Sequence, residues 1–159
     1  MQKIYLSKHN LFFYTLLCIL IILADQVTKQ FMYHEIGLGN TKAFLPGFIQ
    51  FTVVQNTGGA FSIFKQYPVY FKIIGLINIV LFSYLITCSN IKLDQITRVG
   101  FVCILGGTTG NLIDRFLVSG VIDFLELQLF DFAIFNLADI FIDTGVVLVL
   151  IGWVFSKDK

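Results

Sequence analysis

Four long apolar runs, separated by shorter polar stretches, set the pattern of this chain. They cover about residues 9–28, 67–88, 98–118 and 132–154. A helix needs about 20 mostly apolar residues to cross the roughly 30 Å hydrocarbon core of a bilayer, and each run is long enough. The sequence therefore predicts an all-α membrane protein, a four-transmembrane-helix bundle that forms one integral membrane domain over residues 1–159.

The longest stretch between these runs covers residues 30–66. Residues 48–55 are rich in aromatic and β-branched side chains, residues 56–59 have turn chemistry, and residues 60–64 again favour an extended chain. This pattern predicts a small β-hairpin on the membrane surface. Its phenylalanines either press into the interface or form the hairpin's own core. Residues 121–128 are amphipathic and too short to span, so we expect them to lie in the interface.

Composition agrees with the membrane assignment and excludes several classes of site. Hydrophobic residues make up 57% of the chain and charged residues 13%. The net charge of +1 and the absence of a basic stripe argue against binding to nucleic acid. Three cysteines lie in apolar runs without CxxC spacing, which favours a packing role over a disulfide or a metal site.

Polar residues crowd the seam between the last two apolar runs. They are Asn111, Asp114, Arg115, Asp123, Asn136 and Asp139. A charged group at membrane depth costs about 2.5–3.5 kcal/mol on insertion scales, so such residues indicate a functional site. Asn136, Asp139 and Asp143 share one helix face, which we expect to point into the bundle.

The candidate catalytic groups in this polar region are pairs of carboxyls. Both histidines lie within the first 34 residues, remote from the seam, so no Ser/His or Cys/His arrangement is available. Two adjacent carboxyls can share one proton, so that one activates water and the other polarises a carbonyl. Three alternatives stay open: a purely structural polar network, a small proton- or ion-conducting bundle, and a non-enzymatic assembly factor.

Five sequence strings carry a family resemblance. They are Asp25–Lys29 (DQVTK), Asn56–Phe61 (NTGGAF), Gly106–Arg115 (GGTTGNLIDR), Gly120–Phe124 (GVIDF) and Phe135–Asp139 (FNLAD). In this order they resemble the successive motifs of the bacterial lipoprotein signal peptidases, the type II signal peptidases. The resemblance covers most of the chain.

The resemblance implies an intramembrane aspartyl endopeptidase of the bacterial inner membrane. Such an enzyme removes signal peptides from diacylglyceryl-modified prolipoproteins by cleaving before the lipidated cysteine. Both termini would be cytoplasmic, and the site would lie at the outer leaflet. Residues 30–66 would form an extracytoplasmic β-cradle, and residues 121–128 a short interfacial helix. A monomer without metal or cofactor is expected, with family inhibitors such as globomycin in its active site.

The resemblance also assigns roles to residues of this chain. Asp123 and Asp139 are the expected catalytic pair. The expected site-lining residues are Asp25, Asn56, Gly58, Asn111, Arg115 and Asn136. Asp114 and Lys29 are expected to be structural, and we expect Asp114 to bond to Arg115 or to a helix end. Asp25 and Lys29 are spaced i,i+4, which an ion pair and a role in the site explain equally well. Asp143 falls outside the motifs and is not assigned to the site. It is either a buried, neutral carboxyl bonded to a neighbour or a group that perturbs Asp139.

Overall fold

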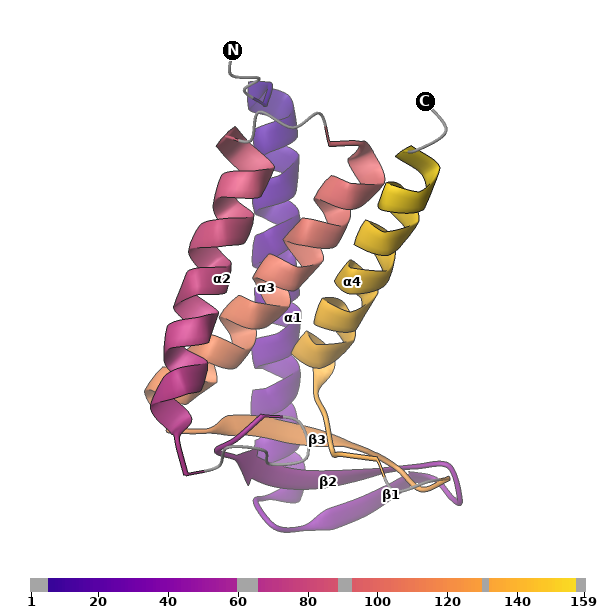
Figure 1. Cartoon of the computed structure of the whole chain (residues 1–159). Helices are drawn as coiled ribbons and strands as arrows, with labels where there is room; N and C mark the ends of the chain where they lie inside the picture. Colours follow the sequence, from indigo (N-terminus) through magenta and orange to yellow (C-terminus); the bar gives the residue numbers. More distant parts are fainter. Residues whose placement is uncertain (1–5, 60–65, 89–92, 130–131, 157–159) are drawn as a thin grey trace.

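The chain folds into a helix bundle with a small sheet across one end (Figure 1). The computed structural model describes residues 6–59, 66–88, 93–129 and 132–156. In chain order the elements are α1 (Lys8–Ile36), β1 (Thr41–Leu45), β2 (Ile49–Asn56), α2 (Pro68–Cys88), α3 (Gln95–Leu117), β3 (Val121–Leu127) and α4 (Leu137–Ser156). α1 begins and α4 ends at the end of the bundle that lies away from the sheet.

Within the described residues four helices are long and apolar enough to cross a membrane, which confirms the predicted four-helix bundle. α3 is the central helix. Of its most apolar 18-residue stretch 56% is buried, against 11–17% of the corresponding stretch in the other three helices. It packs against α1, α2 and α4. The other helices turn most of their apolar side chains outward, as helices do in lipid.

Glycines on α3 let its neighbours approach closely. A Cβ atom on Gly106 would lie 2.7 Å from Ile21 Cγ2 of α1, and one on Gly107 would meet the Ala138 carbonyl oxygen of α4. Small residues at such contacts allow helix backbones to pack together in membranes. Gly106 and Gly107 therefore mark the close contacts of α3 with α1 and α4.

The sheet is antiparallel and has the strand order β1-β2-β3. β3 pairs with β2 so that Asp123 lies opposite Val54 and Val121 lies opposite Asn56. Val53, Ile122 and Phe124 form a small core under the sheet, against which Met32 and Ile36 from the end of α1 pack. This core fixes the sheet to the helix bundle.

Several predicted boundaries change. Residues 121–128 were expected as an interfacial helix, but they form strand β3, because Val121 and Ile122 are β-branched and buried and the segment pairs with β2. α1 continues to Ile36, so residues 30–36 are helical rather than part of the cradle. α4 begins at Leu137 instead of residue 132.

The predicted hairpin is also paired differently. Residues 48–55 do form a strand, β2, but its hairpin partner is the preceding strand β1. The second predicted strand, residues 60–64, lies outside the described residues.

Candidate active site

Asp139 is held in the first turn of α4 by a reciprocal pair of hydrogen bonds with Asn136. The Asn136 side-chain oxygen accepts from the Asp139 backbone N–H at 3.0 Å, and Asp139 Oδ2 accepts from the Asn136 backbone N–H at 3.1 Å. This is a capping box, which satisfies free N–H groups at a helix start. It explains why α4 begins after Asn136, and it fixes the position of the Asp139 carboxyl.

Asp123 reaches the same place from the sheet. It lies near the start of β3, where the strand passes under the bundle, and only 3% of the residue is exposed. The backbone of β3 is held by β2 on one side and by Phe135 on the other, since Phe135 bridges to Leu125. The strand pairing therefore determines which way Asp123 points.

Three asparagines donate hydrogen bonds to the two carboxyls. Asn136 Nδ2 donates to Asp123 Oδ1 at 2.6 Å, and Asn56 Nδ2 donates to Asp123 Oδ2 at 3.1 Å. Asn111 Nδ2 donates to Asp139 Oδ1 at 2.8 Å. Asn136 also donates to the Asn111 side-chain oxygen at 3.1 Å, so the amides link the two carboxyls into one network.

Behind this network lies a buried ionic cluster of Asp25, Lys29 and Asp114. Lys29 Nζ is 2.9 Å from Asp25 Oδ2, from Asp114 Oδ2 and from Asn111 Oδ1. The three protons of the ammonium thus have three acceptors. Asp25 Oδ1 accepts from the Ala138 backbone N–H, and Asp114 Oδ2 accepts from the Ile122 backbone N–H. The cluster ties α1 and α3 to the start of α4 and the start of β3, the two segments that carry Asp139 and Asp123.

Arg115 lies at the edge of the same site. It donates to the Asn111 backbone oxygen at 3.1 Å and to the Gly58 backbone oxygen at 3.3 Å, and its guanidinium stacks over the Phe71 ring. Its Nε is buried and has no hydrogen-bond partner among the described residues. The buried Nε–H donor of Arg115 is therefore free at the edge of this site.

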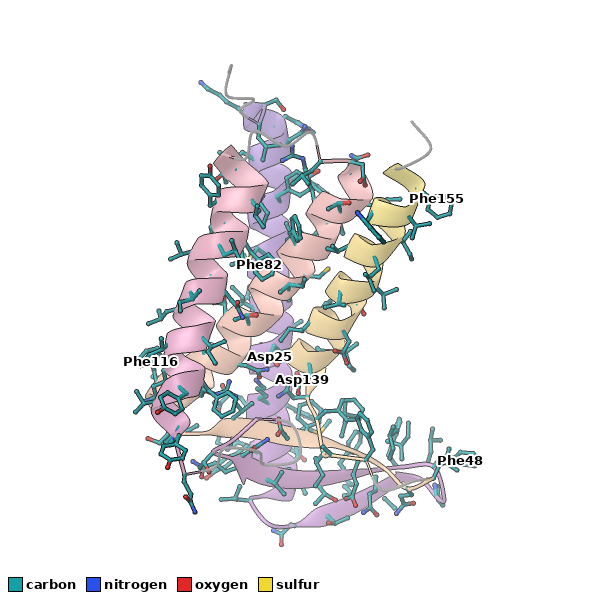
Figure 2. All side chains as sticks on the ribbon, viewed as in Figure 1. Asp25, Phe48, Phe82, Phe116, Asp139 and Phe155 are labelled. Carbon is teal, nitrogen blue, oxygen red and sulfur yellow. The ribbon has the colours of Figure 1, made fainter. Side chains whose placement is uncertain are left out.

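A cavity of about 300 Å³ opens onto the two carboxyls. It is lined from four parts of the chain: by Asn56, Gly58 and Gly59 at and just after the end of β2, by Asn111 and Arg115 of α3, by Val121 and Asp123 of β3, and by residues 132–135 with Asp139, Ile140, Ile142 and Asp143 around the start of α4. Figure 2 shows Asp139 and Asp25 at the sheet end of the bundle. The cavity gives a substrate access to Asp123 and Asp139 together.

Burial dominates the electrostatics of Asp123. Loss of water around the carboxyl, and secondly the neighbouring Asp139, raise the pKa of Asp123 from its ordinary 3.8 to about 7. The hydrogen bonds from Asn136 and Asn56 act in the opposite direction but are weaker. Asp123 can therefore hold or release a proton near neutral pH, as an acid–base catalyst must.

All ten residues singled out from the sequence gather in this region. Asp123, Asp139, Asn56, Asn111, Asn136 and Arg115 form the network or its rim, and Gly58 lines the cavity. Asp25, Lys29 and Asp114 form the cluster behind them, so the expected Asp25–Lys29 ion pair is present. Asp114 has no hydrogen bond or ion pair to Arg115 among the described residues; it ties Lys29 and the first residues of β3 instead.

The structure adds Gln26 to the polar residues of this region and places Asp143. Gln26 donates to Asp114 Oδ1 at 2.9 Å and to Asp25 Oδ2 at 3.2 Å, so it belongs to the cluster. The sequence feature that could have identified Gln26 is its position beside Asp25 in an apolar run. Asp143, which the motifs leave unassigned, is exposed and lines the cavity, so the first of its two expected alternatives, a buried and hydrogen-bonded carboxyl, is wrong.

Comparison with known proteins places this geometry among bacterial membrane enzymes. Residues 17–155 match the family model described as signal peptidase (SPase) II. Lipoprotein signal peptidases of two bacteria are similar to almost the whole chain. That of Lactobacillus johnsonii is 34% identical over 154 residues, which is 97% of this chain and 99% of the relative. That of Streptococcus pyogenes serotype M1 is 37% identical over 145 residues, 91% of this chain and 93% of the relative.

Further comparisons agree with these. A lipoprotein signal peptidase of a Nostoc species is 40% identical over 129 residues, or 80% of each chain. A bacterial membrane enzyme structure solved at 2.3 Å resolution superposes with a TM-score of 0.83 at 28% identity, over 99% of this chain and 94% of that one. The similarity thus extends to the helices and the sheet together.

Proposed function

The chain belongs to the signal peptidase II family, and on that premise we propose that it cleaves its substrates with the carboxyl pair Asp123 and Asp139. It is a multi-pass membrane protease that removes signal peptides from prolipoproteins. The observation that supports the proposed pair is the network in which three asparagines hold two carboxyls, one with a pKa of about 7, at the mouth of one cavity.

In the proposed mechanism Asp139 is the base and Asp123 the acid. Asp139 lies in the first turn of α4, where the helix N-terminus favours a negative charge. It takes a proton from a water molecule, whose oxygen attacks the scissile carbonyl carbon. Asp123 gives its proton to the carbonyl oxygen, and a tetrahedral diol forms.

The second half of the reaction returns both protons. Asp139 passes its proton to the leaving nitrogen, the carbon–nitrogen bond breaks, and Asp123 recovers its proton from the diol as the carbonyl forms again. The products are the carboxyl end of the signal peptide and a free amine on the residue that follows the cut. Arg115, whose Nε is unpaired among the described residues, stabilises charge on the carbonyl oxygen.

The location of the site suits a substrate that stays in the membrane. Asp139 lies at the sheet end of the bundle (Figure 2), and we assign this end to the boundary between hydrocarbon and water. We assign the substrate as a prolipoprotein whose cysteine already carries diacylglycerol, cut just before that cysteine. The acyl chains remain in lipid while the peptide bond enters the cavity.

The orientation follows from this assignment. Signal peptides enter with their N-termini in the cytoplasm, and cleavage takes place on the outer side. The sheet end of the bundle therefore faces outward in the bacterial inner membrane, and both termini of the chain are cytoplasmic. A monomer contains every group that the mechanism uses.

The decisive experiment is cleavage of a diacylglyceryl-modified prolipoprotein by the purified protein in detergent. Wild type is compared with Asp123→Asn, Asp139→Asn and Val147→Ala, the last a control on the outward face of α4. We expect each aspartate change to lower kcat by more than about a thousandfold, since removal of one member of a catalytic pair has effects of this size. Val147→Ala should cleave at the wild-type rate.

Other outcomes separate the competing functions. Cleavage that survives either aspartate change would mean that the pair is assigned wrongly. A wild-type protein that does not cleave, but carries protons or ions across proteoliposome membranes, would instead support a conducting bundle.

A further inference from the structure

Asp143 is the acidic residue of the cavity that the mechanism does not use. It lies on α4 four residues after Asp139, which places it about 6 Å further along the helix, away from the sheet. It lines the same cavity as Asp123 and Asp139, and it is exposed. The neighbouring cavity residues of this helix turn, Ile140 and Ile142, are apolar.

The Asp143 carboxyl has no bonding partner in the described part of the chain. Among the described residues, none forms a hydrogen bond or an ion pair with Asp143. Lys29 is engaged with Asp25, Asp114 and Asn111, and Arg115 is directed to Asn111 and Gly58. An ionisable residue without a partner in a membrane span is costly, which points to a partner outside the chain.

The proposed reaction supplies such a partner. A signal peptide crosses the membrane as a helix, and it must unwind beside Asp123 and Asp139 to expose the scissile bond. Unwinding frees backbone N–H groups, each of which costs several kcal/mol in hydrocarbon unless it finds an acceptor. The segment that precedes the cut runs from the site toward the cytoplasm, which is also the direction of α4 from Asp139 to Asp143.

The rise of an extended peptide determines which of its residues lies beside Asp143. An extended chain advances about 3.3 Å per residue, so about 6 Å corresponds to about two residues. On the basis of the proposed function, we propose that Asp143 is a specificity-determining residue, which accepts hydrogen bonds from the unwound signal peptide about two residues before the cut. The same carboxyl favours a Ser or Thr hydroxyl over an apolar side chain at that point.

The test removes one hydrogen-bond donor from the substrate and the acceptor from the enzyme. Two diacylglyceryl-modified substrates differ only in the second or third backbone amide before the cut, which is replaced by an ester that has no N–H group. Each is cleaved by the full-length wild type, by Asp143→Leu and by the control Thr144→Leu. Thr144 is exposed on the same helix and is not among the residues that line the cavity.

We expect the ester to raise KM about tenfold for wild type and for Thr144→Leu, and to leave kcat within about twofold, since a hydrogen bond to a charged group is worth about that factor. For Asp143→Leu the amide and ester substrates should have equal KM values. Asp143→Asn, which keeps an acceptor oxygen, should restore part of the difference.

Three results would overturn the proposal. The first is an amide-to-ester effect of the same size in wild type and in Asp143→Leu. The second is a fall in kcat without a change in KM, which would show that Asp143 acts on the catalytic pair. The third is an effect that depends on the diacylglyceryl group and not on the amide, which would assign the carboxyl to lipid. A wild type that cleaves neither substrate would instead contradict the proposed function itself.

Discussion

The Lys29 ammonium donates a hydrogen bond of 2.9 Å to Asn111 Oδ1, and this contact determines which end of the Asn111 amide faces Asp139. An ammonium group can only donate, so the amide oxygen must face Lys29. The amide nitrogen is then directed at Asp139. Lys29 of α1 does not line the cavity, yet it orients a hydrogen-bond donor in the proposed active site.

Replacing Lys29 with Met should therefore affect stability and activity together. The change leaves Asp25 and Asp114 buried without a counter-ion, which costs about 3–5 kcal/mol when one partner of a buried ion pair is removed. It also frees the Asn111 amide to turn. We expect a lower melting temperature in detergent and slower cleavage.

A triple variant separates these two effects. Lys29→Met combined with Asp25→Asn and Asp114→Asn removes the buried charges, so the melting temperature should recover in part. The cleavage rate should stay low because the Asn111 amide is still not oriented. Equal melting temperatures of wild type and the single variant would contradict the role given to the cluster.

The rate of cleavage should depend on the protonation of Asp123. Its pKa is raised to about 7 by burial and then by Asp139, so the carboxyl is protonated below that pH and charged above it. Since the proposed mechanism needs the proton, kcat/KM should fall as pH rises above about 7. A rate that stays constant from pH 6 to 9 would contradict this assignment.

Asn56→Ala provides a matched test of the same titration. The Asn56 hydrogen bond lowers the pKa of Asp123, so its loss should raise that pKa. We expect the alkaline limb of the kcat/KM profile to move to higher pH, whatever the absolute rate of the variant. A shift to lower pH would mean that the limb reports another group.

The free energy of unfolding should also depend on the protonation of Asp123. The pKa of Asp123 is higher in the folded chain than its ordinary value of 3.8, so folding is favoured most when the group is protonated. Its contribution is fully present below about pH 4 and is lost as pH rises through about 7. Asp123→Asn lacks this dependence.

The measurement is the melting temperature of both proteins in detergent from pH 4 to pH 8. The value for Asp123→Asn minus that for wild type should increase up to about pH 7 and then level off. A difference that is independent of pH would show that Asp123 has the same pKa in the folded and unfolded chain.

Gly107 should not tolerate a side chain. A Cβ atom there would meet the Ala138 carbonyl oxygen and lie 2.8 Å from Ile142 Cγ1, at the start of the helix that carries Asp139. We expect Gly107→Ala to push α4 away from α3, to destabilise the protein by about 1–3 kcal/mol and to lower kcat.

Gly75→Ala is the control for Gly107→Ala. Its added Cβ would lie 3.0 Å from one methyl group of Leu112, a flexible side chain that can move aside. This variant should melt and cleave like wild type. A Gly107→Ala protein that behaves like Gly75→Ala would mean that the close α3–α4 contact is not needed.

The sequence predicts the bundle well because the bilayer itself sets the length and polarity of a span. The sequence also predicted that Asp123 and Asp139 belong to the candidate site, because charged residues are conspicuous in apolar surroundings. Residues 121–128 were assigned wrongly because a short amphipathic segment has no clear period, and pairing with β2 decided its structure. The extension of α1 to Ile36 was hidden as well, because Met32 and Ile36 near its end pack on Ile122 and Phe124, which lie far along the chain.

The two proposed catalytic groups come from different kinds of structure. Asp123 belongs to a strand of the sheet, and Asp139 to the first turn of a helix in the bundle. They come together only when the sheet is docked on the helix ends, through the contacts of β3 with α1 and α3 and the bridge of Phe135 to Leu125. A chain that is still being inserted therefore carries no working pair. The architecture therefore couples proteolysis to assembly, since the proposed pair can cut only once the sheet is docked on the helices.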